Sequence, residues 1–125
     1  MVLTVEELNK SYRRQPVLSE ITFGIREGEL VSIIGPSGTG KTTLLKLIAG
    51  LERPDSGRID LHGEGGGGSH RNRRFPPAVL VFQEYVLFPH LSVYENIAFG
   101  LRARRVPHSD IAERVNYLLD FFDLT

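Results

Sequence analysis

Hydrophobic and polar residues alternate in the first third of the chain, and this alternation predicts β-strands. Leu3 and Val5 are separated by a polar residue, and a second alternating segment holds Ile21, Phe23 and Ile25. Because side chains two residues apart share one face of a strand, each segment is expected to bury one face. The run from Leu30 to Ile34 is mostly apolar, which predicts a strand buried on both faces.

The period of the apolar residues changes directly after this run. A stripe at helical spacing predicts an amphipathic helix, and it consists of Leu44, Leu47, Ile48 and Leu51. Gly50 and Pro54 are expected to end this helix. Two further strands are predicted, a short one at Ile59 and Leu61 and an apolar one from Val79 to Phe82.

The last third of the chain is predicted to be helical. Ser92 and Glu95 have the spacing of a capping box, which starts a helix containing Ile97 and Leu101. Pro107 is expected to separate this helix from the next one. The second stripe consists of Ile111, Val115, Leu118, Leu119 and Phe122. Strands, a helix, more strands and terminal helices together predict a mixed α/β fold.

The composition excludes several classes of function. The chain has 125 residues, 41% of them hydrophobic, with 15 basic residues, 15 acidic residues and no cysteine. The balanced charge gives no electrostatic case for binding nucleic acid, and the missing cysteines exclude disulfides and thiol catalysis. No apolar run approaches the roughly 20 residues that span a bilayer. We therefore expect a cytoplasmic domain that binds no nucleic acid and has no membrane span.

A glycine-rich segment interrupts the second half of the predicted sheet. Gly65 to Ser69 has the composition of a flexible linker. It is interpreted either as a natural surface loop or as an engineered replacement, which fold reasoning should leave out. Three arginines follow it at positions 71, 73 and 74, and they fit a solvated basic edge better than a nucleic-acid site.

A phosphate-binding motif lies between the third predicted strand and the first predicted helix. Gly35, Gly40, Lys41 and Thr42 match the pattern G-x-x-x-x-G-K-[ST]. Glycines let backbone N–H groups face one anion, and the helix N-terminus adds partial positive charge. Lys41 is expected to reach the outer phosphates, and the Thr42 hydroxyl is a suitable Mg²⁺ ligand.

Three separated motifs resemble the ATP-binding subunits of ABC transporters. They are Lys10-Ser11-Tyr12, the phosphate loop with its helix, and VLVFQE at Val79–Glu84, which is followed by LFPHLSVYENI. The resemblance is strongest to the importer ATPases that serve sugars, polyamines, sulfate or ferric iron. It covers almost the whole chain. It implies a P-loop NTPase-like α/β fold, the N-terminal part of an ABC ATPase domain, with an antiparallel β-subdomain, the Walker A strand-loop-helix and the start of the helical subdomain.

The resemblance assigns roles to particular residues. Tyr12 matches the aromatic residue that stacks on adenine, and Gln83 matches the glutamine that approaches Mg²⁺ and the attacking water. Lys41 and Gln83 are thereby the candidate catalytic residues, and Thr42 and Gln83 the candidate metal ligands. The Walker A loop, which would hold ATP, consists of Gly35, Pro36, Ser37, Gly38, Thr39, Gly40, Lys41, Thr42 and Thr43.

The resemblance also implies a partner and a division into domains. Glu84 to Leu91 match the segment that meets the transmembrane permease. In a monomer such an apolar run would more often be core, but the resemblance favours a partner surface. Residues 1–91 would form the nucleotide-binding β-subdomain with the P-loop core, and residues 92–125 the start of the helical subdomain. The parent complex would lie against the cytoplasmic side of the inner membrane.

The family's signature sequence, its Walker B acids and its switch histidine have no counterpart in this chain. We therefore expect ATP–Mg²⁺ binding with little or no hydrolysis, since phosphoryl transfer needs those groups. A strand at Leu30–Ile34 would lack neighbours, so self-association or domain swapping is also expected. Two alternatives stay open, which are an engineered or truncated scaffold without turnover and a small P-loop kinase with a lid at Arg102, Arg104 and Arg105.

Overall fold

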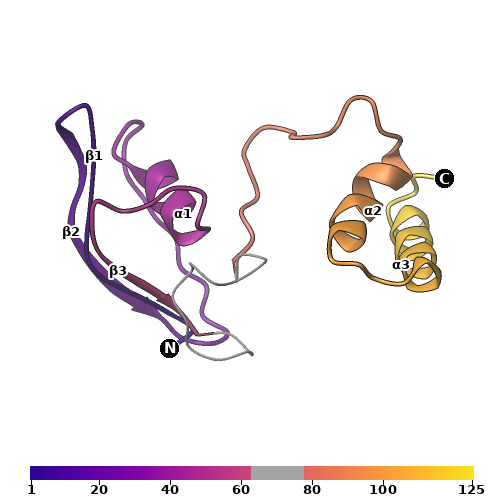
Figure 1. The fold of residues 1–125 in the computed structure, drawn as a ribbon, viewed down its shortest axis with the longest axis horizontal. Helices are drawn as coiled ribbons and strands as arrows, with labels where there is room; N and C mark the ends of the chain where they lie inside the picture. The colour runs from indigo at the N-terminus through magenta and orange to yellow at the C-terminus, as the bar shows by residue number, and fades with distance from the viewer. Residues whose placement is uncertain (63–77) are drawn as a thin grey trace. The chain divides into compact units, whose positions relative to one another are not determined.

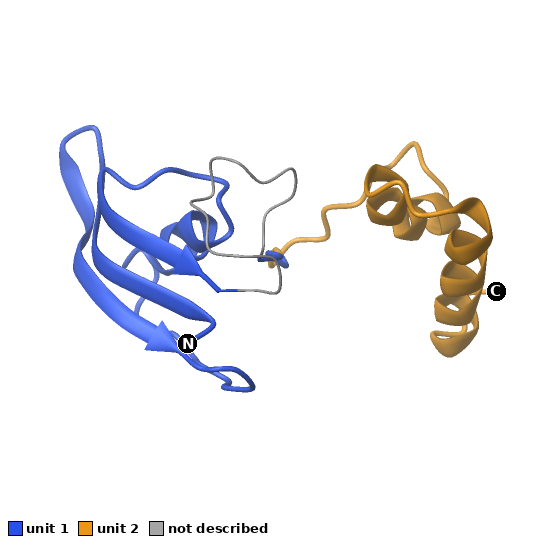
Figure 2. Cartoon of the chain, turned by 60° about the horizontal axis from the view of Figure 1, so that its bottom comes forward, with its two compact units in different colours: residues 1–81 blue, residues 82–125 orange. Residues whose placement is uncertain are grey.

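The computed structural model describes residues 1–62 and 78–125 of the chain. These residues divide into two compact units, Met1–Val81 and Phe82–Thr125, which Figure 2 colours separately. Each unit has its own hydrophobic core. The glycine-rich loop at 65–69 and the arginines at 71, 73 and 74 lie outside the described residues.

The first unit contains a three-stranded antiparallel sheet (Figure 1). Its strands are β1 (Leu3–Tyr12), β2 (Gln15–Ile25) and β3 (Ser56–Leu61), and β1 lies in the centre. The predicted antiparallel β-subdomain is confirmed. The first two strands extend further than the alternation predicts and form a hairpin, because Arg13 and Arg14 both adopt positive φ in a two-residue turn.

A β-bulge halfway along β1 changes which side chains of this strand face the core. Val5 pairs with Phe23 and Leu8 pairs with Ile21, so β1 has one residue more than β2 between these pairs. Glu7 carries a positive φ of 45° there. Since an extra residue moves the following side chain to the other face, Leu8 returns to the face of Leu3 and Val5, and all three are buried.

Helix α1 (Lys41–Ile48) packs its apolar stripe against this sheet (Figure 1). Leu44 and Leu47 are buried and join the core of the three strands. The helix ends as predicted, because the N–H groups of Gly50 and Leu51 bond the carbonyls of Leu47 and Lys46 at 3.1 and 2.9 Å. Leu51 lies beyond the helix and is 56% exposed, so its assignment to the stripe was wrong.

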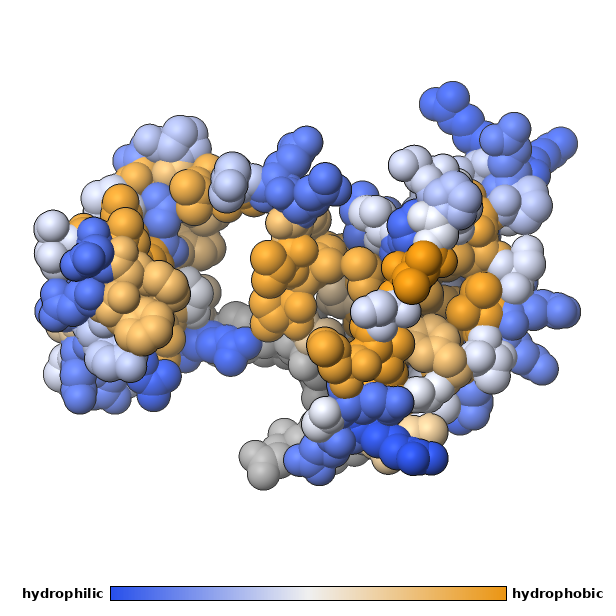
Figure 3. Space-filling view, turned by 180° about the vertical axis from the view of Figure 1, so that it is seen from behind, coloured by the Kyte–Doolittle hydropathy of each residue, from blue (hydrophilic) through white to orange (hydrophobic). Residues whose placement is uncertain are grey.

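Two predicted strands are not formed in the described residues. Neither Leu30–Ile34 nor Val79–Phe82 belongs to a strand or has a place in the sheet. Leu30 and Ile34 are 95% and 93% exposed, and hydrophobic surface is visible on both units in Figure 3. Apolar composition shows that a segment prefers burial, but a strand also needs neighbouring backbones for its N–H and C=O groups. Self-association through these segments stays a prediction, which light scattering of the purified chain would test.

The second unit consists of two helices, α2 (Val93–Ala103) and α3 (His108–Phe121). The capping box is confirmed, because Glu95 N–H donates to Ser92 Oγ at 3.2 Å and Ser92 N–H donates to Glu95 Oε2 at 2.9 Å. The Ser92 backbone bond, and then its hydroxyl bond, lower the pKa of the Glu95 carboxyl. The carboxylate therefore stabilises the start of α2 above its unfolded pKa, and this contribution fades as the pH falls through the lowered value.

Apolar residues of both helices meet in the second core. Ala98, Ile111 and Val115 are buried there, and Ile97, Leu101 and Leu119 pack around them. Phe122 follows the end of α3 and is 61% exposed, so the predicted stripe stops one turn earlier. Pro107 precedes the first residue of α3, as expected. Across residues 1–62 and 78–125, no helix combines the length and hydropathy needed to cross a bilayer.

Candidate functional site

The phosphate loop approaches β2 closely at the N-cap residue of α1. Gly40 is the N-cap of α1, and its φ is 91°. A Cβ atom at this position would lie 2.9 Å from Val17 Cγ1 and 3.0 Å from the Val17 carbonyl oxygen. Only a glycine combines this φ with so close an approach. The packing against β2 therefore sets where the helix N-terminus points.

The Lys41 ammonium lies across the loop that precedes it. Its Nζ donates to the Gly35 carbonyl at 2.6 Å, to the Pro36 carbonyl and to Thr39 Oγ1 at 3.3 Å. Thr39 Oγ1 in turn donates to the Pro36 carbonyl at 2.7 Å. An ammonium has three donors, and here the loop itself accepts from all of them. An anionic ligand would have to replace at least one of these neutral acceptors. A charged oxygen would accept a stronger hydrogen bond from Lys41 than a neutral oxygen does.

The first turn of α1 is suited to an anion. It contains no acidic side chain, and Gly40 supplies no side-chain cap. The first N–H groups of a helix have no intrahelical acceptor, and the helix dipole makes this end partially positive. Thr42 in this turn is exposed, so its hydroxyl is accessible to a ligand. An anion held here would meet backbone donors, an ammonium and a hydroxyl within one helical turn.

Tyr12 connects the end of β1 to the loop after α1. Its hydroxyl donates to Glu52 in that loop. The bond to Glu52, and then partial desolvation, raise the pKa of Tyr12, while the neighbouring Thr43 side chain opposes the rise. The phenol thus remains a protonated donor at neutral pH, and its ring is 40% exposed.

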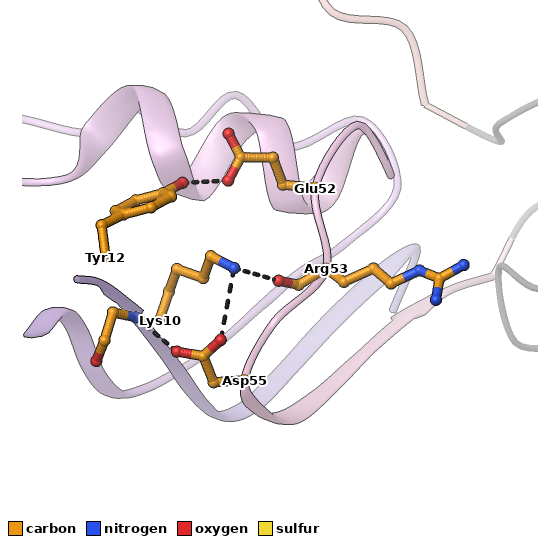
Figure 4. A network of polar contacts seen from close by, with 6 residues as sticks. Lys10, Tyr12, Glu52, Arg53 and Asp55 are labelled. Carbon is orange, nitrogen blue, oxygen red and sulfur yellow. Dashed lines mark hydrogen bonds and ion pairs between the residues drawn. The ribbon is translucent and has the colours of Figure 1, made fainter. Parts of the chain in front are cut away.

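A second set of contacts holds the two residues that precede Tyr12 (Figure 4). Lys10 Nζ donates to the Arg53 carbonyl at 2.8 Å and lies 3.5 Å from Asp55 Oδ1. Asp55 Oδ2 accepts from the Ser11 N–H at 2.7 Å. The ammonium of Lys10 also lies over the Tyr12 ring, 5.2 Å from its centroid. The end of β1 is therefore fastened to the loop that follows α1.

Gln83 belongs to the second unit, where its side chain is exposed. The segment Glu84–Leu91 is exposed over nearly its whole length, with Tyr85 96% and Val86 70% accessible. Its C-terminal end is fixed to α2. Asn96 Oδ1 accepts from the Phe88 N–H at 2.9 Å, and Asn96 Nδ2 donates to the carbonyls of Phe88, Leu91 and Ser92 at 3.2, 3.1 and 2.9 Å.

Among the predicted site residues, the first unit brings Lys41 together with its own loop, whereas Tyr12 bonds Glu52, which was not predicted. Sequence reasoning missed Glu52 and Asp55, which hold the end of β1. Neither belongs to a recognised motif, and 40 residues separate Tyr12 from Glu52. The available signal was weak, since it was only a pair of acids on either side of the turn-forming Pro54.

Comparison with known proteins places this loop in a family. Residues 18–124 match the family described as ABC transporter. The sulfate/thiosulfate import ATP-binding protein CysA of Methylococcus capsulatus is 48% identical over 99% of this chain and 36% of its own length. The spermidine/putrescine import ATP-binding protein PotA of Hahella chejuensis is 46% identical over 94% of this chain and 32% of its own length. The chain thus spans about a third of these relatives.

A solved structure agrees with this match. The ATP-binding subunit of an ABC transporter superposes with a TM-score of 0.71 at 27% identity, covering 99% of this chain and 51% of that one. The similarity therefore includes the β-sheet, the phosphate loop and the terminal helices. By sequence and by fold, the chain belongs to the ABC transporter family and corresponds to part of an import ATP-binding subunit.

Proposed function

We propose that this chain binds ATP with Mg²⁺ and forms the nucleotide-binding part of an importer ATPase. The observation that carries the proposal is the convergence of the Lys41 ammonium and the uncapped N-terminus of α1 on one loop. Gly35 to Thr43 would hold the phosphates, and Tyr12 would stack on the adenine. A planar ring with a free face suits a base because stacking needs no base-edge contacts.

The residues at the loop fit a magnesium nucleotide. Thr42 offers an exposed hydroxyl oxygen, which is the type of ligand that Mg²⁺ accepts alongside phosphate oxygens and waters. Gln83, in the second unit, stays a prediction of the family resemblance, as a neutral carbonyl oxygen suited to a metal or to water. When bound, Mg²⁺ neutralises charge on the outer phosphates. Lys41 would supply a mobile positive charge to the same oxygens.

The parent function proposed here is ATP-driven solute import at the cytoplasmic face of a membrane. A family match over residues 18–124 favours this function over the kinase alternative. The relatives are named for sulfate/thiosulfate and for spermidine/putrescine, an anion and a polycation, at nearly equal identity. Because similar sequences accompany solutes of opposite charge, we infer that this part of the subunit does not select the solute.

Removing the Lys41 ammonium is expected to abolish most nucleotide affinity. A hydrogen bond to a charged group is worth roughly 1.5–3 kcal/mol, so Lys41→Ala should weaken ATP–Mg²⁺ binding about 10- to 100-fold in calorimetry. Arg26→Ala is the matched control, because it removes one positive charge from an exposed turn outside the loop. Equal affinities in the native chain and in Lys41→Ala would overturn the proposal.

The exposed apolar segment of the second unit is proposed to contact a transmembrane permease. Its apolar run ends at Phe88, which Asn96 and Phe99 hold on α2, with the two phenylalanine ring centroids 4.5 Å apart. The run Tyr85–Leu87 is thereby presented from a fixed base, as a partner-binding patch requires.

A photo-crosslinker at Val86 is expected to capture a membrane-embedded protein in cells that express the chain. A crosslinker at Glu113, which is exposed on α3, is the matched control. Capture of soluble proteins alone from position 86, or equal capture of the membrane protein from both positions, would contradict the permease contact.

A further inference from the structure

Tyr12 is held at its phenol end by a residue that is distant in the sequence. The Glu52 carboxylate, in the loop after α1, accepts a hydrogen bond from its hydroxyl. An aromatic side chain rotates about two torsions, and a hydrogen bond at the tip of the ring restricts the first of them, χ1, which moves the phenol oxygen. The ring of Tyr12 is therefore linked to the loop that follows α1.

Lys10 restricts the same ring from one of its faces. Its ammonium lies 5.2 Å from the ring centroid and is itself held by the Arg53 carbonyl and by Asp55. The side chain of Lys10 is only 15% exposed, so this cation has a defined place. A planar ligand that stacks on Tyr12 would take the face opposite Lys10.

We propose that Glu52 is a positioning residue that sets the Tyr12 ring for the base of a bound nucleotide. The inference rests on the proposed nucleotide binding and deepens it. Glu52 lies at the opposite end of α1 from the phosphate loop, so it would contact Tyr12 rather than the phosphates. Its effect should depend on the presence of a base, whereas Lys41 acts on any polyphosphate.

Glu52 would raise the affinity for a nucleotide by holding the Tyr12 ring in place before the nucleotide binds. Without Glu52 the ring must be immobilised during binding, and ordering one such side chain weakens affinity about three- to tenfold. The ion pair of Glu52 with Lys46, at 3.9 Å, involves two partly exposed side chains and should contribute little. The hydrogen bond to Tyr12 is the contact that matters for the base.

The test compares ATP with inorganic tripolyphosphate, which has the phosphates and no base, both with Mg²⁺ and by calorimetry on the full 125-residue chain. Glu52→Ala should weaken ATP binding about three- to tenfold and leave tripolyphosphate binding within about twofold. Glu52→Gln should restore most of the ATP affinity, because the amide oxygen accepts the same hydrogen bond. Tyr12→Phe keeps the ring and should match Glu52→Ala, with no further loss in the double variant.

Two variants serve as controls. Glu27→Ala removes the same charge from an exposed turn, and Lys46→Ala removes the ion pair, and both should bind ATP like the native chain. Circular dichroism of every variant separates lost binding from lost folding. Suppose that the native chain binds both ligands. The role of Glu52 alone would then be overturned if Glu52→Ala kept its ATP affinity, or if it lost affinity equally for ATP and for tripolyphosphate. Failure of the native chain to bind either ligand would overturn the proposed function as well.

Discussion

Replacing Gly57 with alanine is expected to unfold the sheet of the first unit. Gly57 lies on β3 opposite the bulge of β1, with a φ of 88°. A Cβ atom there would lie 2.3 Å from the Glu7 carbonyl oxygen and 2.6 Å from Leu8 Cα. These are backbone atoms of the central strand, so they cannot move aside without breaking the pairing of β1 with β3.

The expected loss is large for a chain of this size. Backbone strain of about 1–3 kcal/mol and overpacking of about 1–3 kcal/mol together approach the total stability of a marginal domain. Gly28→Ala is the matched control, since Gly28 also has a positive φ of 74° but open space where the Cβ atom would be. Chemical denaturation followed by circular dichroism should show a much lower midpoint for Gly57→Ala. Equal midpoints for the two variants would contradict the observed register.

Replacing Gly40 with alanine is expected to impair both the phosphate loop and the packing of α1. The added Cβ atom would press on Val17 and on Leu18 Cδ2, which lies 3.0 Å away, and force the helix N-terminus off β2. Because one of these contacts is the Val17 backbone, side-chain rotation alone cannot relieve the overlap. ATP–Mg²⁺ affinity should fall at least about tenfold, which corresponds to about 1.4 kcal/mol.

Gly38 provides the comparison within the same loop. It also has a positive φ, 80°, but nothing lies within 4 Å of the position that a Cβ atom would take. Gly38→Ala should therefore lower the thermal unfolding temperature less than Gly40→Ala. At Gly38 the added Cβ atom would cause backbone strain but no steric overlap. If the two variants unfolded at the same temperature, the contact with β2 would not be what fixes the start of α1.

Local signals were sufficient for the helices, and they also predict the phosphate loop. The Ser92–Glu95 capping box and the end of α1 at Gly50 were predicted and are confirmed. In each case the groups that bond are within five residues of one another along the chain. The motif at Gly35–Thr42 also carries its chemistry locally, since the loop and the first helical turn are adjacent in the sequence.

The sheet and the contacts of Tyr12 could not be predicted from local sequence, because they depend on contacts between distant segments. Nothing near Glu7 in the sequence indicates that β1 gains a residue there, because the bulge is defined only by the pairing of β1 with β2 and β3. At the bulge, the Glu7 N–H donates to Thr22 Oγ1 at 2.9 Å. The hairpin at Arg13–Arg14 was missed for a similar reason, since no glycine or asparagine marks it. The pairing of strands is specified by register and burial more than by the residues of one strand.

The residue types of this chain thus predict a phosphate loop and specify its helices, because short-range hydrogen bonds and periodicity depend on neighbouring positions. Tertiary contacts determine whether an apolar segment becomes a strand, and Leu30–Ile34 remains exposed because the described residues supply no neighbouring backbone for it. They also determine that Glu52 meets Tyr12. A contact across 40 residues depends on how α1 packs on the sheet, which no local pattern encodes.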